Sequence, residues 1–286
     1  MSMSHNLPKD REDDIGTHLI MAALKVETSN VEAITVAKTM AIAQETGLFG
    51  KRKESSHYAK KILQEYPQFT GSYFGYEPNA DQDDKEYLHQ VGTDHGGLDA
   101  NGRFLPYWFR EIKGPSTITL NPLIDMETSL YYQGVKDKLL SGSQEKYLIT
   151  EPYVYEGKMM IEQVYPVVID GKFVGIAGVD RALTDLHEVL QGLKPYKTAD
   201  LILVSRLGKV IAATIDPGLQ AKPLNETPYK DILNSFYQNT TGRPNLALLT
   251  DPVDGQKYFY GGVPITTGDW TLVMRVSEEE ILSTQK

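Results

Sequence analysis

The chain has 286 residues, a length that fits one large domain or two medium ones, and 41% of them are apolar, which suffices for a sizeable core. The net charge of −9 comes without a cluster of Lys and Arg, which argues against binding to a nucleic acid. No cysteine is present, so a disulfide scaffold, a thiolate zinc site and a cysteine nucleophile are excluded.

The N-terminus begins MSMSHNLPKD, which is typical of an expression leader, so we interpret residues 1–12 as a leader or linker. No signal-peptide pattern is present. No part of the sequence approaches 18 consecutive apolar residues, so we expect no transmembrane helix within it. We expect the natural protein to continue in both directions.

A long helix is predicted from about residue 13 to residue 46, because apolar side chains recur there at helical spacing. Gly47 and Gly50 end it, and a second helix is expected over 54–66, where a proline follows. Together they make residues 13–66 an N-terminal helical region. The first helix is long for a globular protein, so either it packs on a core throughout or part of it forms a dimer seam or a stalk.

Residues 67–193 change to short strands and turns, which predicts a sheet-and-helix module. Its expected strands are 73–76, 104–113, 117–120, 159–168 and 172–179, and its expected helices are 129–140 and 181–193. The pair Asp170-Gly171 suits the positive φ angles of a tight hairpin turn between the last two strands. The acidic stretch 77–87 lacks the spacing of a calcium loop, so we expect a solvated loop there.

Residues 194–276 repeat this organisation in a shorter form and predict a second module. Its expected strands are 201–204, 210–213, 246–250, 257–262 and 270–276, with one helix at 228–238. Residues 277–286 are expected to form a C-terminal helix that leads towards a membrane segment.

The two modules can be aligned at their most apolar strands. YPVVIDGKFVGIAGVDRALTDL (165–186) matches VPITTGDWTLVMRVSEEEIL (263–282), and this alignment places Asp180 opposite Ser277. Ser277 precedes three glutamates, which is typical of a helix N-cap. Asp180 has two interpretations at this stage: it caps a helix that begins at Arg181, or its carboxylate faces a ligand.

Four segments resemble the double Cache sensor domains: EPNA (77–80), GRFLPYW (102–108), EPYVY (151–155) and GKFVGIAGVD (171–180). The resemblance extends over about residues 15–286. It implies an α+β fold of two tandem PAS-like modules with antiparallel sheets and a long N-terminal helix that often serves as a dimer element. It also implies the ectodomain of a bacterial chemoreceptor or sensor histidine kinase, on the periplasmic or extracellular side of the inner membrane and anchored by flanking helices. In this family the membrane-distal module, here 67–193, usually binds the small molecule.

Family members that recognise amino acids have an Arg-x-Trp-Tyr pattern, then Tyr-x-Asp, then the aspartate of the Gly-Val-Asp strand. The corresponding residues here are Ser129, Tyr131 and Tyr132, then Tyr153 and Tyr155, then Asp180. The aspartate is kept, but the arginine that would hold a ligand carboxylate has become serine. We therefore expect a small polar ligand with an ammonium group, surrounded by these aromatic side chains. The sequence leaves open whether the ligand is an ordinary amino acid.

Three further residues, in the GRFLPYW segment and just after it, are candidate site residues. Trp108 is added to the expected ligand contacts. Arg103 and Arg110 are candidates to replace the missing guanidinium, or else they face solvent.

No nucleophile-elbow, phosphate-loop, zinc-protease or dinucleotide-binding motif occurs, so we expect this chain to be no enzyme, although the full-length parent could carry a histidine kinase. The adjacent pair Asp94–His95 is interpreted as surface loop, and Glu151, Glu162 and Asp180 are carboxylates without a fixed separation. No cofactor and no metal are implied. The alternatives are a free periplasmic solute-binding protein, which usually has two βαβ lobes, and, more remotely, an uncharacterised hydrolase. Whether sensing is direct or through a partner binding protein stays open, as do the ligand and the output domain.

Overall fold

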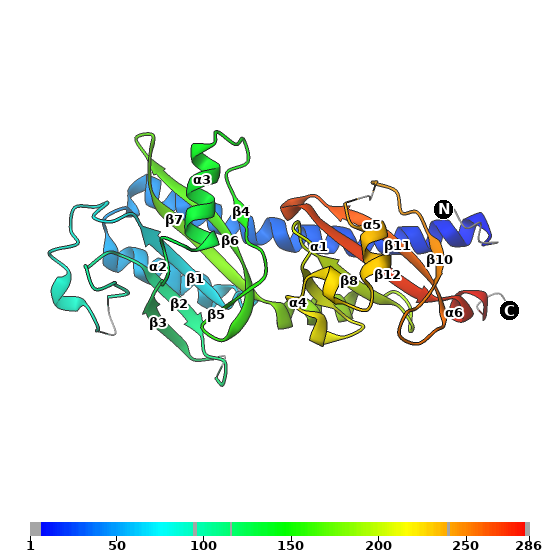
Figure 1. Cartoon of the computed structure of the whole chain (residues 1–286). Coiled ribbons are helices and arrows are strands. Elements are labelled where there is room, and N and C mark those ends of the chain that lie inside the picture. The colour runs from blue at the N-terminus through cyan, green and yellow to red at the C-terminus, as the bar shows by residue number, and fades with distance from the viewer. Residues whose placement is uncertain (1–6, 94–95, 115, 239–240, 284–286) are drawn as a thin grey trace. The chain divides into compact units, whose positions relative to one another are not determined.

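The computed structural model describes residues 7–93, 96–114, 116–238 and 241–283 (Figure 1). Residues 1–6 of the expected leader, the Asp94–His95 pair and residues 284–286 of the expected C-terminal helix lie outside the described residues. No helix among the described residues has the length and apolar character needed to cross a membrane.

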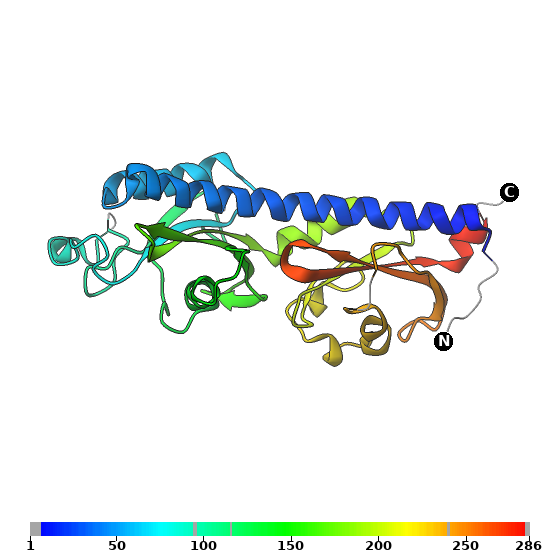
Figure 2. The same cartoon turned by 90° about the horizontal axis from the view of Figure 1, so that it is seen from above.

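The chain begins with the predicted long helix, α1 (Lys9–Ala43), followed by the turn η1 (Gln44–Leu48) and by α2 (Arg52–Glu65) (Figure 2). Gly47 has φ +131°, a value that L side chains rarely adopt, and it ends the helical run as expected. The inner side of α1 is buried, with Ala33, Ala37 and Met40 all 0% exposed. Its outer side leaves Met21, Leu24 and Val31 at 52%, 59% and 46% exposure, so the dimer seam stays a prediction.

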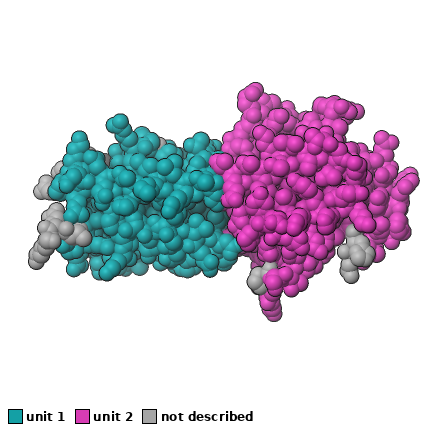
Figure 3. Space-filling view, turned by 180° about the vertical axis from the view of Figure 1, so that it is seen from behind, with its two compact units in different colours: residues 1–30, 151–154, 183–286 teal, residues 31–150, 155–182 magenta. Residues whose placement is uncertain are grey.

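The structure divides into two compact units (Figure 3). Unit 1 comprises residues 1–30, 151–154 and 183–286, and unit 2 comprises residues 31–150 and 155–182. Helix α1 contributes residues to both. The expected division at 67–193 and 194–276 stays a prediction.

Unit 2 is built on a seven-stranded antiparallel sheet with the order β3-β2-β1-β7-β6-β4, and β5 also pairs with β6. The strands are β1 (Gly71–Tyr76), β2 (Pro106–Arg110), β3 (Ile118–Pro122), β4 (Leu148–Ile149), β5 (Tyr153–Tyr155), β6 (Lys158–Ile169) and β7 (Lys172–Ala182). The β6–β7 hairpin turns at Asp170 and Gly171, with φ +50° and +75°, and confirms the predicted turn.

The two faces of this sheet carry different covers. Helices α1 and α2 pack on one face, where Ser72 contacts Met40 and Phe74 lies beside Tyr58. The turn η3 (Leu130–Gly134) and helix α3 (Val135–Leu140) cover the other face, as the green helix in Figure 2 shows. Because side chains alternate along a strand, odd-numbered residues of β1 face η3 and even-numbered ones face α2.

Unit 1 contains a five-stranded antiparallel sheet with the order β10-β11-β12-β8-β9. Its strands are β8 (Asp200–Val204), β9 (Val210–Ala213), β10 (Ala247–Thr250), β11 (Lys257–Ile265) and β12 (Trp270–Ser277), and its helices besides α1 are α4 (Leu183–Leu193), α5 (Lys230–Phe236) and α6 (Glu278–Ser283). The hydroxyl of Ser277 accepts the N–H of Glu280 at 3.4 Å, which confirms the predicted cap. Two antiparallel sheet modules with a long N-terminal helix confirm the predicted fold class.

The helix expected to begin at Arg181 begins at Leu183 instead. Asp180 and Arg181 still lie inside β7, paired with Glu162 and Ile161 of β6. The interpretation of Asp180 as a helix N-cap is therefore wrong, because the sheet ladder continues past the aspartate.

Two carboxylates of the acidic loop are not solvated as we expected. Asp81 and Asp84 turn inward and hold Arg52 at the start of α2, with N–O distances of 2.7 Å to Asp81 and 2.6 Å to Asp84. The Arg52 side chain is 3% exposed, and a buried guanidinium requires such carboxylate partners. Arg103 likewise does not face solvent: it is 5% exposed and donates to Glu127 at 2.9 Å.

Candidate ligand-binding site

Asp180 lies in the middle of the unit 2 sheet and is completely buried. Its Cα partners are Gly71 on β1 and Glu162 on β6, so its side chain is on the sheet face that η3 covers. A Cβ atom on Gly71 would lie 2.5 Å from the Asp180 Oδ2 atom and 2.5 Å from the Tyr107 ring. The glycine therefore provides the space in which these two side chains meet.

The Asp180 carboxylate accepts hydrogen bonds from two hydroxyls. Thr70 Oγ1 donates to Oδ1 at 2.5 Å, and the Tyr107 hydroxyl donates to Oδ2 at 2.8 Å. Burial raises the pKa of Asp180, although these two donors and the positive charge of Lys158 oppose the rise. The site thus holds a carboxylate that would gain from a nearby cation.

Glu162 is a second buried carboxylate on the same sheet face, 1% exposed and directly opposite Asp180. Burial is the largest cause that raises the pKa of Tyr107, Tyr131 and Tyr155, and the negative charge of Glu162 raises all three further. From the sequence, Glu162 was only one of three carboxylates without a fixed separation. Its position inside an otherwise apolar strand, MMIEQVYPVV, was the available signal.

Four tyrosines form a closed cycle of edge-to-face contacts next to these carboxylates. Ring centroids are 5.9 Å apart for Tyr73 and Tyr107, and 5.4 Å for Tyr107 and Tyr155. They are 6.1 Å apart for Tyr155 and Tyr131, and 6.0 Å for Tyr131 and Tyr73. Tyr131 and Tyr155 were predicted site residues, whereas Tyr73 and Tyr107 were not. We call these four residues the tyrosine cycle.

A small cavity of about 80 Å³ borders the cycle at Tyr107 and Tyr155. Lys158 also lines it and lies 5.3 Å from the Phe109 ring centroid, while its ammonium donates to the Arg110 carbonyl. The cavity is lined by aromatic rings together with charged side chains.

Ser129 and Tyr132 have other roles in the structure. The Ser129 hydroxyl accepts the N–H of Tyr132 at 3.3 Å and caps η3. The Tyr132 hydroxyl donates to Glu77, and its ring centroid lies 5.1 Å from the Arg103 guanidinium and 5.8 Å from Phe173. Tyr132 thus belongs to a neighbouring charged cluster rather than to the Asp180 group.

Trp108 is also placed away from Asp180. Trp108 follows Tyr107 on β2, so it faces α2 on the opposite side of the sheet, where its Nε1 atom donates to Ser56 at 3.0 Å. Tyr153 is half-buried at the start of β5 and falls among the residues of unit 1. Of the seven predicted site residues, the structure brings together Asp180, Tyr131 and Tyr155.

Comparison with known proteins places this arrangement in a family. The family model for the first PDC sensor domain of methyl-accepting chemotaxis protein-like proteins matches residues 56–188. The extracellular domain of the candidate histidine kinase mmHK1S-Z3 is 27% identical, with 97% of this chain and 98% of that chain covered and a TM-score of 0.82. The extracellular domain of the candidate histidine kinase mmHK1S-Z2 is 30% identical, with 93% of this chain and 95% of that chain covered and a TM-score of 0.71. The chain belongs to the double Cache family of sensor domains.

The sensor domain shares its fold with more distant relatives as well. The ligand-binding domain of the Pseudomonas fluorescens chemoreceptor CtaA, solved in complex with L-isoleucine, is 19% identical, with 96% of each chain covered and a TM-score of 0.63. Among curated proteins none matches by sequence. The matched family region contains Tyr73, Tyr107, Glu162 and Asp180, so the sheet face described above lies within the sensor module.

Proposed function

We propose that this sensor domain is the extracytoplasmic part of a bacterial transmembrane signal transducer and binds a small, amine-bearing molecule on the η3-covered face of the unit 2 sheet. The observation that carries the proposal is the pair of buried carboxylates, Asp180 and Glu162, directly opposite each other beside the tyrosine cycle. A ligand ammonium would neutralise this negative charge and donate hydrogen bonds to it. The tyrosine rings would surround its carbon atoms and attract its charge.

A ligand carboxylate has weaker support. Ser129 takes the place of the arginine found in the amino-acid pattern, and its hydroxyl is used as a helix cap. Arg110, one of the two arginines considered as replacements, donates to the backbone carbonyls of Phe69 and Leu63. The ammonium group, rather than the complete amino acid, is therefore the part of the ligand that the site specifies.

Signalling follows from a difference in affinity between two conformations. A ligand that binds one arrangement of the tyrosine cycle better than another shifts the equilibrium towards it by that difference alone. The change would reach a kinase or chemoreceptor output domain through flanking membrane helices outside this chain. The exposed apolar residues of α1, Met21 and Leu24 among them, support a homodimer in which such a change could be transmitted.

A thermal-shift screen of primary amines and amino acids tests the proposal. A ligand at 100 times its dissociation constant adds about 2.7 kcal/mol to the free energy of unfolding, a clearly measurable rise in melting temperature. Asp180→Asn keeps the shape of the side chain but removes its charge, so we expect it to lose the shift. Asp170→Asn, in the exposed turn of the same hairpin, is the matched control and should keep it.

Two results would contradict the proposal. If no amine in a broad panel raises the melting temperature, the site has no such ligand. If Asp180→Asn responds to the amine as strongly as the wild type, the amine binds elsewhere. The free solute-binding alternative is tested separately, by whether the natural gene encodes apolar segments immediately before and after this chain.

A further inference from the structure

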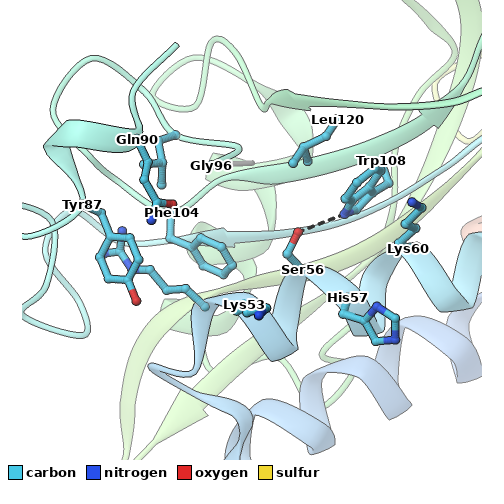
Figure 4. A pocket seen from close by; sticks show the side chains of 12 residues that line it. Lys53, Ser56, His57, Lys60, Tyr87, Gln90, Gly96, Phe104, Trp108 and Leu120 are labelled. Atoms are coloured by element: carbon cyan, nitrogen blue, oxygen red, sulfur yellow. Dashed lines mark hydrogen bonds between the residues drawn. The ribbon is translucent and has the colours of Figure 1, made fainter. Parts of the chain in front are cut away.

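A second pocket lies on the other face of the unit 2 sheet, away from the tyrosine cycle. Its volume is about 640 Å³, within the range typical of small-molecule sites. It opens between α2, strand β2 and the residues Tyr87, Gln90, Gly96 and Leu98 (Figure 4). Trp108 lines this pocket and Tyr107 does not, because neighbouring residues of a strand face opposite sides.

The inner wall of the pocket is apolar and held in place by fixed side chains. Trp108, Phe104 and Leu98 form much of it, and the last two are 1% and 6% exposed. The hydrogen bond from the Trp108 indole to Ser56, drawn as a dashed line in Figure 4, fixes the ring orientation. Phe104 contacts Tyr76 edge-to-face at 4.9 Å. A flat apolar group could pack on this wall without ordering it first.

The α2 side of the pocket is basic. Lys53, His57 and Lys60 line it, and their spacing of four and three residues places them on one side of the helix. The Lys60 ammonium lies 4.8 Å from the Trp108 ring centroid, so it is held over the indole. Among the described lining residues there is no Asp or Glu, although the whole chain has a net charge of −9.

The remaining cation of the pocket is already neutralised. Arg52 is bound by Asp81 and Asp84 and lies between the rings of Tyr87 and Phe104, 4.5 Å and 5.4 Å from their centroids. The available positive charge therefore comes from Lys53 and Lys60. Within the described part of the chain, neither ammonium lies within 4.0 Å of a carboxylate.

We propose that this pocket binds a small organic anion with a flat apolar body, such as an aromatic carboxylate. The ring would pack on Trp108 and Phe104, and the anionic group would lie between Lys53 and Lys60 with His57 as a further donor. This site has the opposite charge preference to the Asp180 site and lies on the opposite face of the same sheet. The sensor domain would thus take two ligands of opposite charge.

Phenylacetate, phenylacetamide and phenethylamine are three probes with the same ring and a negative, neutral or positive group. We expect calorimetry to detect phenylacetate binding to the wild type, with the neutral amide at least about tenfold weaker. The double variant Lys53→Gln/Lys60→Gln should lose about tenfold or more in phenylacetate affinity. Lys61→Gln, one residue along α2 in an exposed pair with Glu65, is the matched control and should bind as the wild type does.

Tryptophan emission locates the bound probe. The chain has 2 Trp residues, and the other one, Trp270, is buried in β12 of unit 1. In a Trp270→Phe protein, Trp108 is the remaining tryptophan, and phenylacetate should still change its emission. If the change in emission disappears in this variant, the assignment to this pocket is overturned. Unchanged melting temperatures of the lysine variants show that the fold is intact.

Several outcomes would overturn the proposal. No binding of phenylacetate to the wild type, or unchanged affinity for the double lysine variant, excludes this site. Loss of phenylacetate binding on Asp180→Asn with no effect of the lysine variants would place the ring in the tyrosine cycle. If instead the lysine variants dissociate a dimer in ultracentrifugation while phenylacetate has no effect, the pocket is an interface between copies. Retained phenylacetate binding in Asp180→Asn supports two independent sites.

Discussion

Each of the two units contains a buried aspartate, but the two aspartates differ in which groups face the carboxylate. In unit 1, Asp251 is 1% exposed and receives a hydrogen bond from the guanidinium of Arg275, which also lies 3.0 Å from Asp200 and stacks on Tyr258 at 4.1 Å. In unit 2, the carboxylate of Asp180 receives its hydrogen bonds, among the described residues, from the hydroxyls of Thr70 and Tyr107.

The pKa values respond in opposite directions. Burial alone would raise the pKa of Asp251, but the backbone N–H groups of Asp254 and Val253, the Tyr260 hydroxyl and Arg275 outweigh it and lower the pKa. Burial prevails at Asp180 and raises its pKa. In unit 1 the buried carboxylate is therefore neutralised by an arginine of the same unit. In unit 2 the pKa of the buried carboxylate stays raised, so a ligand cation would stabilise its charged form. This difference supports the proposal that unit 2 binds the ligand.

The largest effect on stability is expected at Arg275. Replacing it by Met removes the cation and leaves Asp251 buried without its charge partner, which typically costs about 3–5 kcal/mol. Urea unfolding should show this loss for Arg275→Met, whereas Asp180→Asn should cost little or stabilise the ligand-free protein at neutral pH. Arg206→Met, at an exposed arginine of the same unit, is the control. Equal losses for Arg275→Met and Asp180→Asn would mean that the two aspartates are equivalent.

A second prediction concerns the space that Gly71 provides. An alanine Cβ there would lie 2.5 Å from both the Asp180 carboxylate and the Tyr107 ring, so these groups must move apart. We expect Gly71→Ala to cost about 1–3 kcal/mol in unfolding free energy and to weaken amine binding. Gly192→Ala, in α4 with no atom within 4 Å of the added Cβ, should be neutral or stabilise by about 0.5 kcal/mol. A Gly71→Ala protein as stable as the wild type would show that this contact does not hold the site together.

Most of the fold could be predicted from the sequence because its signals are local. Helical spacing indicated α1 and α2, the Asp170-Gly171 turn indicated the β6–β7 hairpin, and the tandem pattern indicated two modules. Strand ends were less accessible. Whether β7 ends at Asp180 or continues to Ala182 depends on the length of its partner strand. Strand β6 is long enough to pair with Asp180 and with Ala182.

The site was predicted only in part because the side on which a residue faces depends on register. Trp108 and Tyr107 are adjacent in the sequence, yet only Tyr107 reaches Asp180. Tyr73 comes from β1, whose pairing with β7 is a long-range feature, so nothing local linked it to Asp180. Glu162 lies in the predicted β6–β7 hairpin, but its place opposite Asp180 depends on the register shift at Val167 and Val168. Buried salt bridges were equally hard to predict from the sequence. Asp81 and Asp84 bind Arg52 because of the path of the loop, which its composition does not reveal.

The smallest predicted effect is the pH dependence of stability at Asp180. Its folded-state pKa is raised, so above the unfolded value of about 3.9 the folded state binds more protons than the unfolded state. This group's contribution to stability therefore falls as pH rises from about 4 up to its folded pKa. Carboxylates with lowered pKa values, such as Asp251 and Glu280, act the other way and lose their stabilising effect as pH falls.

The difference in unfolding free energy between Asp180→Asn and the wild type separates the single group from this background. We expect the difference to grow in favour of the variant between pH 4 and neutral pH, because ionisation of the buried carboxylate destabilises only the wild type. Urea titrations of both proteins at several pH values would measure it. A difference that shrinks with rising pH would mean that a cation of the protein already stabilises the carboxylate, as Arg275 does for Asp251. Saturation with a bound amine should have that same effect on the wild type, because the ligand then places its own cation at the carboxylate.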